Sequence, residues 1–139
     1  MIRVGLVGAG FMGEMHTNVY AVLSDVQVVG VADRVLAKAE KQAAKVGARV
    51  YESFEALLAG EETDVVDICL PTYLHREYVV RAAQAGKHVF CEKPLALTEE
   101  DAAAMVNACR ERGVMFTVGQ CIRFWPEYQM LARYIAEGT

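Results

Sequence analysis

The sequence predicts an α/β domain built on a doubly wound parallel sheet, and three observations lead to this fold class. Short apolar runs rich in β-branched residues alternate with segments of helical periodicity along the whole chain. These runs are apolar throughout, as in strands that are buried on both faces of a parallel sheet. The 139 residues contain no repeat, low-complexity segment or linker, so we expect one domain.

The expected strands and helices alternate in order. The apolar runs predict strands at 2–8, 26–33, 48–51, 64–70, 88–92 and 114–120. The helices expected after them occupy 11–23, 36–46, 54–59, 72–85, 98–113 and 126–138. A strand, a helix and a strand in succession form a right-handed crossover unit, and a chain of such units builds a parallel sheet with helices on both faces.

Capping residues and apolar faces support the helices. Residues suited to begin a helix are Ser53, Thr72, Thr98 and Pro126, and the glycines that end helices are Gly47, Gly86 and Gly113. Acidic residues follow Thr98 in the first turn, as the helix dipole favours. The buried faces expected from helical spacing are Leu36, Ala39, Ala43 and Val46 in one helix and Ala102, Met105, Val106 and Cys109 in another.

Composition and charge exclude several classes of function. Hydrophobic residues make up 54% of the chain and charged residues 23%, which is typical of a globular protein. A net charge of −4 argues against a surface that binds nucleic acid or an anionic membrane. No apolar stretch approaches the roughly 18 residues of a membrane-spanning helix. The opening segment MIRVGLVGAG is unlike a signal peptide, so we expect a cytoplasmic protein.

The four cysteines are Cys69, Cys91, Cys109 and Cys121, and each lies in an apolar run. No pair has the spacing of a metal or redox motif, so buried, reduced thiols are expected. The histidines at 16, 75 and 88 show no spacing typical of metal ligands either. The sequence therefore predicts no metal site.

A glycine-rich turn lies between the first expected strand and the first helix. Gly8, Gly10 and Gly13 form the pattern G-x-G-x-x-G, with Phe11 and Met12 between the last two glycines. The first glycine permits a tight turn, the second lets the backbone approach a pyrophosphate, and the third lets the helix lie close to the strand. The diphosphate would then lie at the positive end of the helix. No Gly-Lys-Ser/Thr follows, so the turn is not a nucleoside-triphosphate loop.

Asp33 is the last residue of the second expected strand, 20 residues after Gly13, and Arg34 follows it. A carboxylate at this place accepts hydrogen bonds from the adenosine ribose and repels a 2′-phosphate, so Asp33 favours NAD. Arg34 can stack on adenine or pair with a 2′-phosphate, which leaves NADP possible. The simpler alternatives are a turn residue at the strand end for Asp33 and a solvated charge for Arg34.

Further candidates follow the other strands. Ligands of a doubly wound sheet bind outside the carboxyl ends of its strands. The residues expected at that edge are Leu70, Pro71, Thr72, Glu92, Lys93 and Gln120. Beside a nicotinamide, Lys93 would hydrogen-bond a substrate hydroxyl and help to remove its proton as hydride leaves, so it is the candidate catalytic residue.

Several of these segments together resemble a known family. GLVGAGFMGEMH, VADR, CLPTYLH, VFCEKPLALT and GQCIRFWPEY are similar to the N-terminal domain of the Gfo/Idh/MocA oxidoreductases, which include glucose–fructose oxidoreductase and inositol dehydrogenase. The resemblance implies that Lys93 lies at the active site and Glu92 near the nicotinamide ribose. It also implies that the element from Pro71 to His75 flanks the cofactor and that Arg123 belongs to the site. For His75, a polar residue in an exposed first helical turn is the alternative.

The resemblance also implies how the chain is organised. Residues 1–122 would be an NAD(P)-binding Rossmann domain and 123–139 a helix leading to a second domain that is absent from this chain. In the family that domain supplies substrate contacts, a catalytic histidine of an Asp-x-x-x-His element and usually the oligomer interface. We therefore expect a cofactor domain of a sugar, inositol or polyol oxidoreductase and a homo-oligomer. The alternatives are a free-standing NAD(P)-binding or redox-sensing module and, less well matched, an S-adenosylmethionine-dependent methyltransferase.

Overall fold

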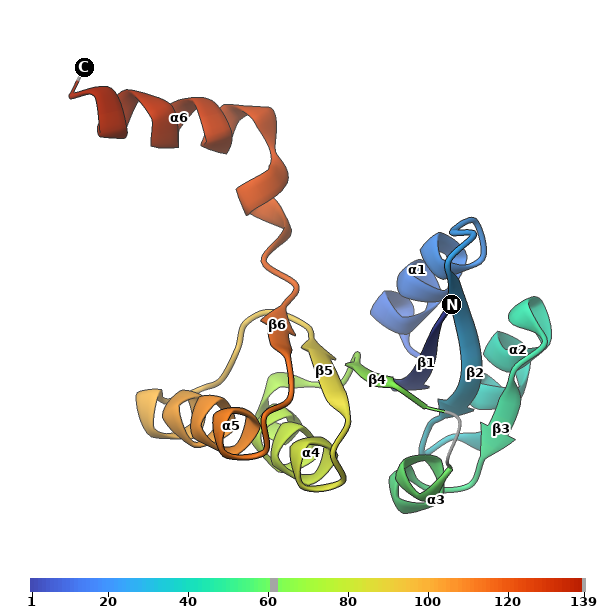
Figure 1. Ribbon diagram of the computed structural model, residues 1–139. Helices are drawn as coiled ribbons and strands as arrows, with labels where there is room; N and C mark the ends of the chain where they lie inside the picture. The colour runs from blue at the N-terminus through green and yellow to red at the C-terminus, as the bar shows by residue number, and fades with distance from the viewer. Residues whose placement is uncertain (61–62, 139) are drawn as a thin grey trace.

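The computed structural model describes residues 1–60 and 63–138, which form a six-stranded sheet (Figure 1). Its strands are β1 Ile2–Val7, β2 Val26–Ala32, β3 Arg49–Tyr51, β4 Val65–Ile68, β5 His88–Cys91 and β6 Phe116–Val118. They lie in the order β3-β2-β1-β4-β5-β6 and all pair in parallel. The order reverses between β1 and β4, so the predicted doubly wound α/β fold is confirmed.

Helices cover both faces of the sheet. They are α1 Phe11–Tyr20, α2 Leu36–Val46, α3 Phe54–Ala59, α4 Thr72–Gln84, α5 Glu99–Glu111 and α6 Pro126–Glu137, with a short 3₁₀ helix, η1, at Cys121–Phe124. Side chains of α3, α4 and α5 pack in one core layer against β4 and β5. Those of α2 pack in a second layer against β1 and β2, and α1 lies beside α2. This two-layer burial is what the uniformly apolar strands require.

The strands carry the centre of both core layers. Leu6, Val31, Val66 and Ile68 are fully buried, and they come from the three neighbouring strands β1, β2 and β4. Removing such side chains from water supplies about 1.5–3 kcal/mol each. The middle of the sheet is therefore the rigid part of the molecule, and the loops at its carboxyl edge are built on it.

Several element boundaries differ from the sequence prediction. Helix α1 ends at Tyr20, because the amides of Val22 and Leu23 bond back three residues in tight turns. The strand expected at 114–120 shortens to Phe116–Val118, the three residues that pair with β5. Thr72 does not cap its helix, since Pro71 holds that position and Thr72 is the first helical residue.

Burial also differs from the prediction at single positions. Leu36 and Val106 were expected on buried faces, but their exposed fractions are 47% and 38%. Cys91 and Cys109 are buried as expected, Cys69 is half-buried, and Cys121 is exposed. Leu36 is the first residue of α2, and Cys121 lies in η1, beyond the last strand.

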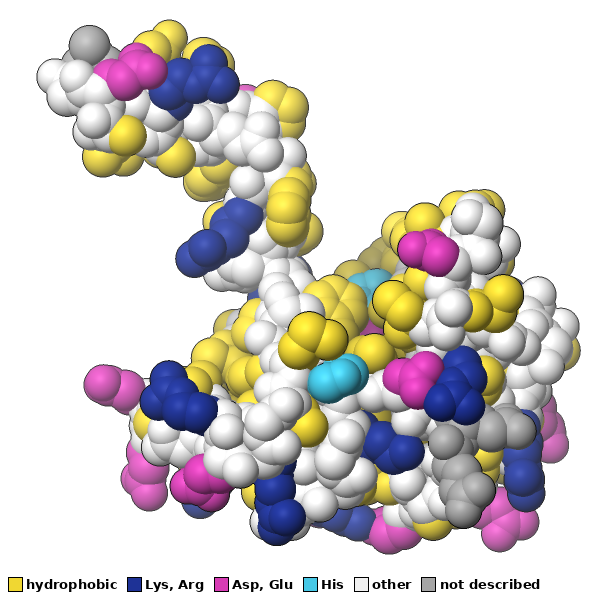
Figure 2. All heavy atoms as spheres, viewed as in Figure 1, with side chains coloured by type: hydrophobic (Ala, Val, Ile, Leu, Met, Phe, Trp, Pro, Cys, Tyr) yellow, Lys and Arg dark blue, Asp and Glu magenta, His cyan; other side chains and the backbone are white. Residues whose placement is uncertain are grey.

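The segment from η1 through α6 projects away from the sheet as an arm (Figure 1). Figure 2 shows hydrophobic side chains along this arm. Its exposed large hydrophobic residues are Ile122, Phe124, Trp125, Tyr128, Met130, Leu131, Tyr134 and Ile135. Thr139, the last residue of the segment predicted at 123–139, lies outside the described residues. Within residues 1–60 and 63–138, no helix combines the length and the apolarity needed to cross a bilayer.

Candidate functional site

Two cavities open along the carboxyl edge of the sheet. The first, of about 430 Å³, is bordered by the ends of β1, β2 and β4 and by the start of α3. The second, of about 940 Å³, is bordered by α1, the ends of β5 and β6, and η1. The glycine-rich turn lies between them, since Gly10 lines the first cavity and Met12 the second. An elongated ligand can thus span both cavities across this turn.

Each glycine of the turn meets a different steric requirement. Gly8 has a φ of +98°, a conformation that side chains rarely adopt, and a Cβ there would lie 2.5 Å from the Cys69 carbonyl oxygen. A Cβ on Gly13 would lie 2.0 Å from the Gly8 carbonyl oxygen, so this glycine lets α1 lie against the turn. A Cβ on Gly10 would meet no atom within 4 Å, so the space beside this residue is open, and Gly10 lines the first cavity. Gly10 therefore leaves open the space that a bound diphosphate needs at a helix N-terminus.

The carboxylate of Asp33 is held at the mouth of the first cavity. Its Oδ2 accepts a hydrogen bond of 2.7 Å from the amide of Ala9, and its Oδ1 accepts one of 2.7 Å from the amide of Val35. A carboxylate has about four acceptor positions, so each oxygen retains capacity for a ligand hydroxyl. Arg34 and Lys38 line the same cavity, so two cations face the ligand beside this anion.

The segment after β4 contributes in two ways. Leu70 and Pro71 line the first cavity. His75 is buried, with its Nε2 2.8 Å from the Leu70 carbonyl oxygen and its Nδ1 3.1 Å from the Leu95 carbonyl oxygen. His75 thereby ties the loop after β4 to the loop after β5. The alternative of an exposed polar residue at this position is wrong.

The second cavity collects the candidates from β5 and β6. Met12, Glu92, Lys93, Gln120 and Arg123 all line it. Glu92 is buried, and its Oε2 accepts a hydrogen bond of 3.0 Å from the amide of Lys93. Lys93 itself is exposed, so its ammonium group is accessible from the cavity.

Four of the predicted site residues line neither cavity. They are Phe11, Gly13, Thr72 and His75. Gly13 and His75 are buried and shape the loops around the cavities, whereas Phe11 is exposed on α1. Their assignment to cofactor binding stays a prediction.

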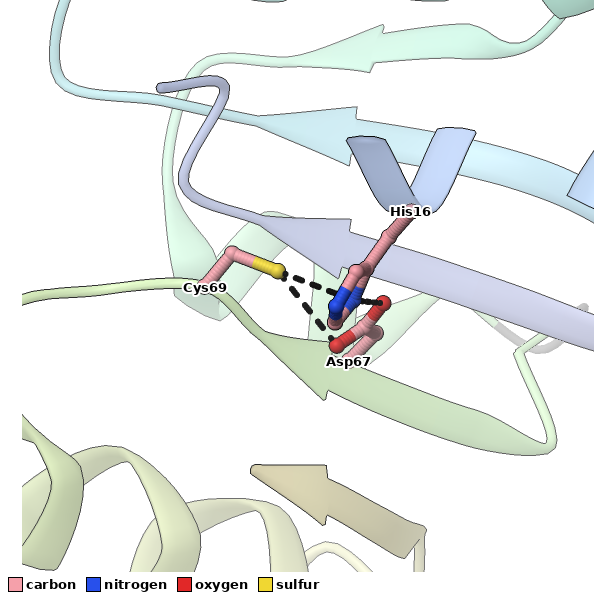
Figure 3. A group of neighbouring side chains, drawn as sticks. All are labelled: His16, Asp67 and Cys69. Carbon is pink, nitrogen blue, oxygen red and sulfur yellow. Dashed lines mark hydrogen bonds and ion pairs between the residues drawn. The ribbon is translucent and has the colours of Figure 1, made fainter. Parts of the chain in front are cut away.

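His16 on α1, Asp67 on β4 and Cys69 just after β4 form a cluster (Figure 3). The His16 ring reaches from α1 toward β4, with its Nδ1 2.8 Å from Asp67 Oδ2 and 3.3 Å from Cys69 Sγ. The Cys69 thiol donates to Asp67 Oδ1 at 3.5 Å. Burial and the adjacent Asp67 charge raise the pKa of this thiol, so it stays protonated. Since metals bind the thiolate, these atoms are better described as a hydrogen-bond network.

Sequence reasoning missed this cluster and part of the first cavity. His16, Asp67 and Cys69 are separated along the chain, and none belongs to a pattern with ligand spacing. Lys38, Glu52 and Tyr73 line the first cavity but look like ordinary solvated residues of helices and loops. For His16, a usable signal was its place one helical turn after Gly13, on the buried side of α1.

Known proteins with the same fold and related sequence were found by comparison. A curated relative from Escherichia coli strain K12, 2,7-anhydro-N-acetylneuraminate hydratase, is 36% identical over 139 residues, which cover the whole chain and 37% of the relative. Inositol 2-dehydrogenase from Rhizobium meliloti strain 1021 is 35% identical over 99% of the chain and 41% of the relative. The crystal structure of the WlbA dehydrogenase from Bordetella pertussis, in complex with NADH and UDP-GlcNAcA, is 34% identical, with a TM-score of 0.93. That match covers 99% of this chain and 40% of the other.

The chain thus spans about two fifths of the length of these relatives. The family model, in contrast, matches most of this chain, from residue 2 to residue 120. It includes all six strands and the glycine-rich turn. The chain belongs to the GFO_IDH_MocA oxidoreductase family, and residues 2–120 form its NAD-binding Rossmann fold.

Proposed function

We propose that this chain is the cofactor-binding part of an NAD-dependent oxidoreductase that transfers hydride between nicotinamide and a hydroxyl carbon of a sugar, inositol or related polyol. The observation that carries the proposal is that the two cavities lie on either side of the glycine turn, with Asp33 lining the first and Lys93 lining the second. The first cavity is suited to bind a ribose beside Asp33, and the second is suited to hold the reacting groups beside Lys93. The names of the relatives support a carbohydrate-like substrate.

The adenosine half of the dinucleotide would occupy the first cavity. Asp33, anchored through both oxygens, would accept hydrogen bonds from the ribose hydroxyls and repel a 2′-phosphate. Arg34 would stack on the adenine, with Leu70 and Pro71 lining the other side of the cavity. Gly8 and Gly10 would bring backbone amides to the pyrophosphate. This arrangement favours NAD over NADP.

The nicotinamide half would occupy the second cavity, where the bound cofactor supplies the hydride acceptor or donor. Lys93 would hydrogen-bond the substrate hydroxyl and accept its proton during oxidation. Glu92 would lie near the nicotinamide ribose, and Met12, Gln120 and Arg123 would complete the walls. Exposure of Lys93 on one side of the cavity leaves it free to contact a substrate.

Residues 1–122 would act as the cofactor domain, and 123–139 as the start of a connection to a substrate domain. The exposed apolar side chains of the arm support this division, because contiguous apolar surface of this kind normally lies in an interface. A substrate domain would supply a catalytic histidine and most of the substrate contacts. We therefore expect the 139-residue chain to bind cofactor and to turn over little substrate on its own.

Calorimetric titration with NADH and NADPH tests the cofactor assignment. We expect NADH to bind more tightly than NADPH, and Asp33→Ala to weaken NADH binding about 10- to 100-fold, the loss of about 1.5–3 kcal/mol from hydrogen bonds to a charged group. Glu40→Ala is the matched control, because Glu40 is an exposed carboxylate on α2 that lines neither cavity. Equal weakening by both variants, or tighter binding of NADPH, would overturn the assignment of Asp33.

A further inference from the structure

His16 bridges two buried carboxylates that come from neighbouring strands. Its Nδ1 lies 2.8 Å from Asp67 Oδ2 on β4, and its Nε2 lies 3.2 Å from Glu92 Oε1 at the end of β5. The ring also stacks on Phe90, with 5.4 Å between the centroids and 22° between the planes. Only 14% of the His16 side chain is exposed, so this geometry is enclosed on most sides.

The hydrogen bonds around Asp67 and Glu92 indicate the protonation state of His16. Asp67 is fully buried and also receives hydrogen bonds from the Tyr20 hydroxyl at 2.9 Å and the Cys69 thiol, as an ionised acceptor would. When both carboxylates are ionised, a ring with each nitrogen against a carboxylate oxygen must donate from both nitrogens. Such a ring is an imidazolium, and it offsets the cost of burying the two negative charges.

The electrostatic environment of His16 also favours the imidazolium form. Burial lowers the pKa of His16, but the hydrogen bond and charge of Asp67, together with those of Glu92, outweigh burial and place the pKa above its ordinary value. The other titratable groups in contact with the ring or with Asp67 are the Cys69 thiol and the Tyr20 hydroxyl. Burial raises the pKa of both, so they remain neutral donors. Lys93 and Arg123 line the same cavity as His16.

The Glu92 carboxylate connects His16 to the backbone amide of Lys93. One Glu92 oxygen faces His16, and the other accepts the Lys93 amide at 3.0 Å. A Cβ on Gly119 would lie 2.9 Å from Glu92 Oε1, the oxygen that faces His16, so the carboxylate packs directly against the backbone after β6. The carboxylate is therefore confined between α1 and the end of β6, and its place determines where the Lys93 amide is held.

We propose that His16 is an imidazolium that bridges Asp67 and Glu92, and that this bridge positions the turn carrying Lys93 at the nicotinamide half of the site. His16 is thus a positioning residue, which acts on Lys93 through Glu92. The inference rests on the proposed function for the role of Lys93, whereas the bridge itself requires no bound nucleotide.

The bridge makes the Lys93 turn sensitive to a rise in pH through the pKa of His16. A histidine whose pKa is raised by folding contributes its stabilisation at pH values below its unfolded pKa and loses it as the pH rises through the folded value. Above the folded pKa of His16, only one ring nitrogen carries a proton, so one of the two hydrogen bonds to Asp67 and Glu92 is lost. The Lys93 amide should then lose its fixed acceptor, and cofactor binding should weaken as the pH rises through the pKa of His16.

Nuclear magnetic resonance of the chain without nucleotide tests the bridge directly. Side-chain ¹⁵N and ¹³C shifts of the histidines, assigned with His16→Gln, should show both ring nitrogens of His16 protonated below a titration midpoint that lies above the ordinary 6.5. The Lys93 amide resonance should titrate with the same midpoint and lose this titration in His16→Gln. His88→Gln is the matched control, because His88 accepts the Met115 amide away from the cluster and should leave the Lys93 titration intact.

A second variant keeps the test decisive if His16→Gln does not fold. Gly119→Ala displaces the Glu92 carboxylate and leaves His16 and Asp67 unchanged, so the His16 midpoint should fall and the Lys93 titration should be lost. A His16 midpoint at or below the ordinary 6.5 would overturn the proposal, as would a Lys93 amide resonance that does not change as His16 titrates. Failure of NADH to bind while these shifts behave as expected would instead count against the proposed function alone.

Discussion

Replacing Gly13 with alanine should destabilise this fold, because the third glycine of the turn is the point where α1 touches the turn. A Cβ at this position would lie 2.0 Å from the Gly8 carbonyl oxygen, 3.1 Å from its carbon and 3.3 Å from Leu6 Cδ2. Side chains rarely tolerate such contacts below 3.0 Å, so α1 and the turn must separate by about 1 Å. The clashing atoms are backbone, so no side-chain rotation relieves the strain.

The magnitude follows from two opposing effects. Overpacking of this kind costs about 1–3 kcal/mol, and alanine recovers up to about 1 kcal/mol through its higher helix propensity. We expect a net loss of about 1–2 kcal/mol in the free energy of unfolding. At this chain length, that loss corresponds to a melting temperature lower by about 4–8 °C.

Gly10→Ala is the matched control, since it adds the same methyl group three residues away. No atom lies within 4 Å of a Cβ there, and the φ of −81° suits any residue, so stability should change by less than about 0.5 kcal/mol. NADH binding should nevertheless weaken by at least about tenfold, because Gly10 lines the first cavity and the added methyl group would hinder the close approach of the diphosphate. The two glycines therefore separate a packing requirement from a binding requirement.

Urea unfolding followed by circular dichroism, combined with calorimetric titration of NADH, measures both effects. Gly13→Ala should shift the unfolding midpoint with an unchanged slope, whereas Gly10→Ala should change only the dissociation constant. A Gly13→Ala protein as stable as the parent would refute the claim that contact between α1 and the turn requires glycine. A Gly10→Ala protein with unchanged NADH affinity would refute the placement of the diphosphate.

Two further predictions concern stability in acid and association. The hydrogen bonds from Arg3 hold the pKa of Asp64 at about 2, so their stabilisation should be present above pH 3.8 and decline as the pH falls through 2. Asp64→Asn should reduce this part of the acid dependence in pH-resolved melting curves. The exposed aromatic residues Phe124, Trp125 and Tyr128 should cause the chain to self-associate, and serine at all three should reduce this. Sedimentation that shows a clean monomer at high concentration for the parent chain would contradict the association.

Much of the fold follows from local pattern. Uniformly apolar strands, helical spacing and the glycines between β1 and α1 are enough to predict a doubly wound sheet, because each depends on residues close together in the chain. Because the carboxyl ends of parallel strands lie at one edge of the sheet, Asp33 and Lys93 are expected at the same edge, although they are 60 positions apart in the chain. The C-terminal arm shows the limit of such reasoning, since its helix is predicted correctly but its projection from the sheet is not.

Periodicity and turn chemistry act over a few residues, so the order of the elements, the glycine turn and the residues at the carboxyl edge can be derived from the sequence. The burial of His75 between two loops and the place of His16 between Asp67 and Glu92 become visible only in the folded chain. Those contacts join residues from different strands and helices. Their partners are set by the packing of whole elements, whereas local spacing indicates only which side of a helix is buried, as it does for His16 on α1.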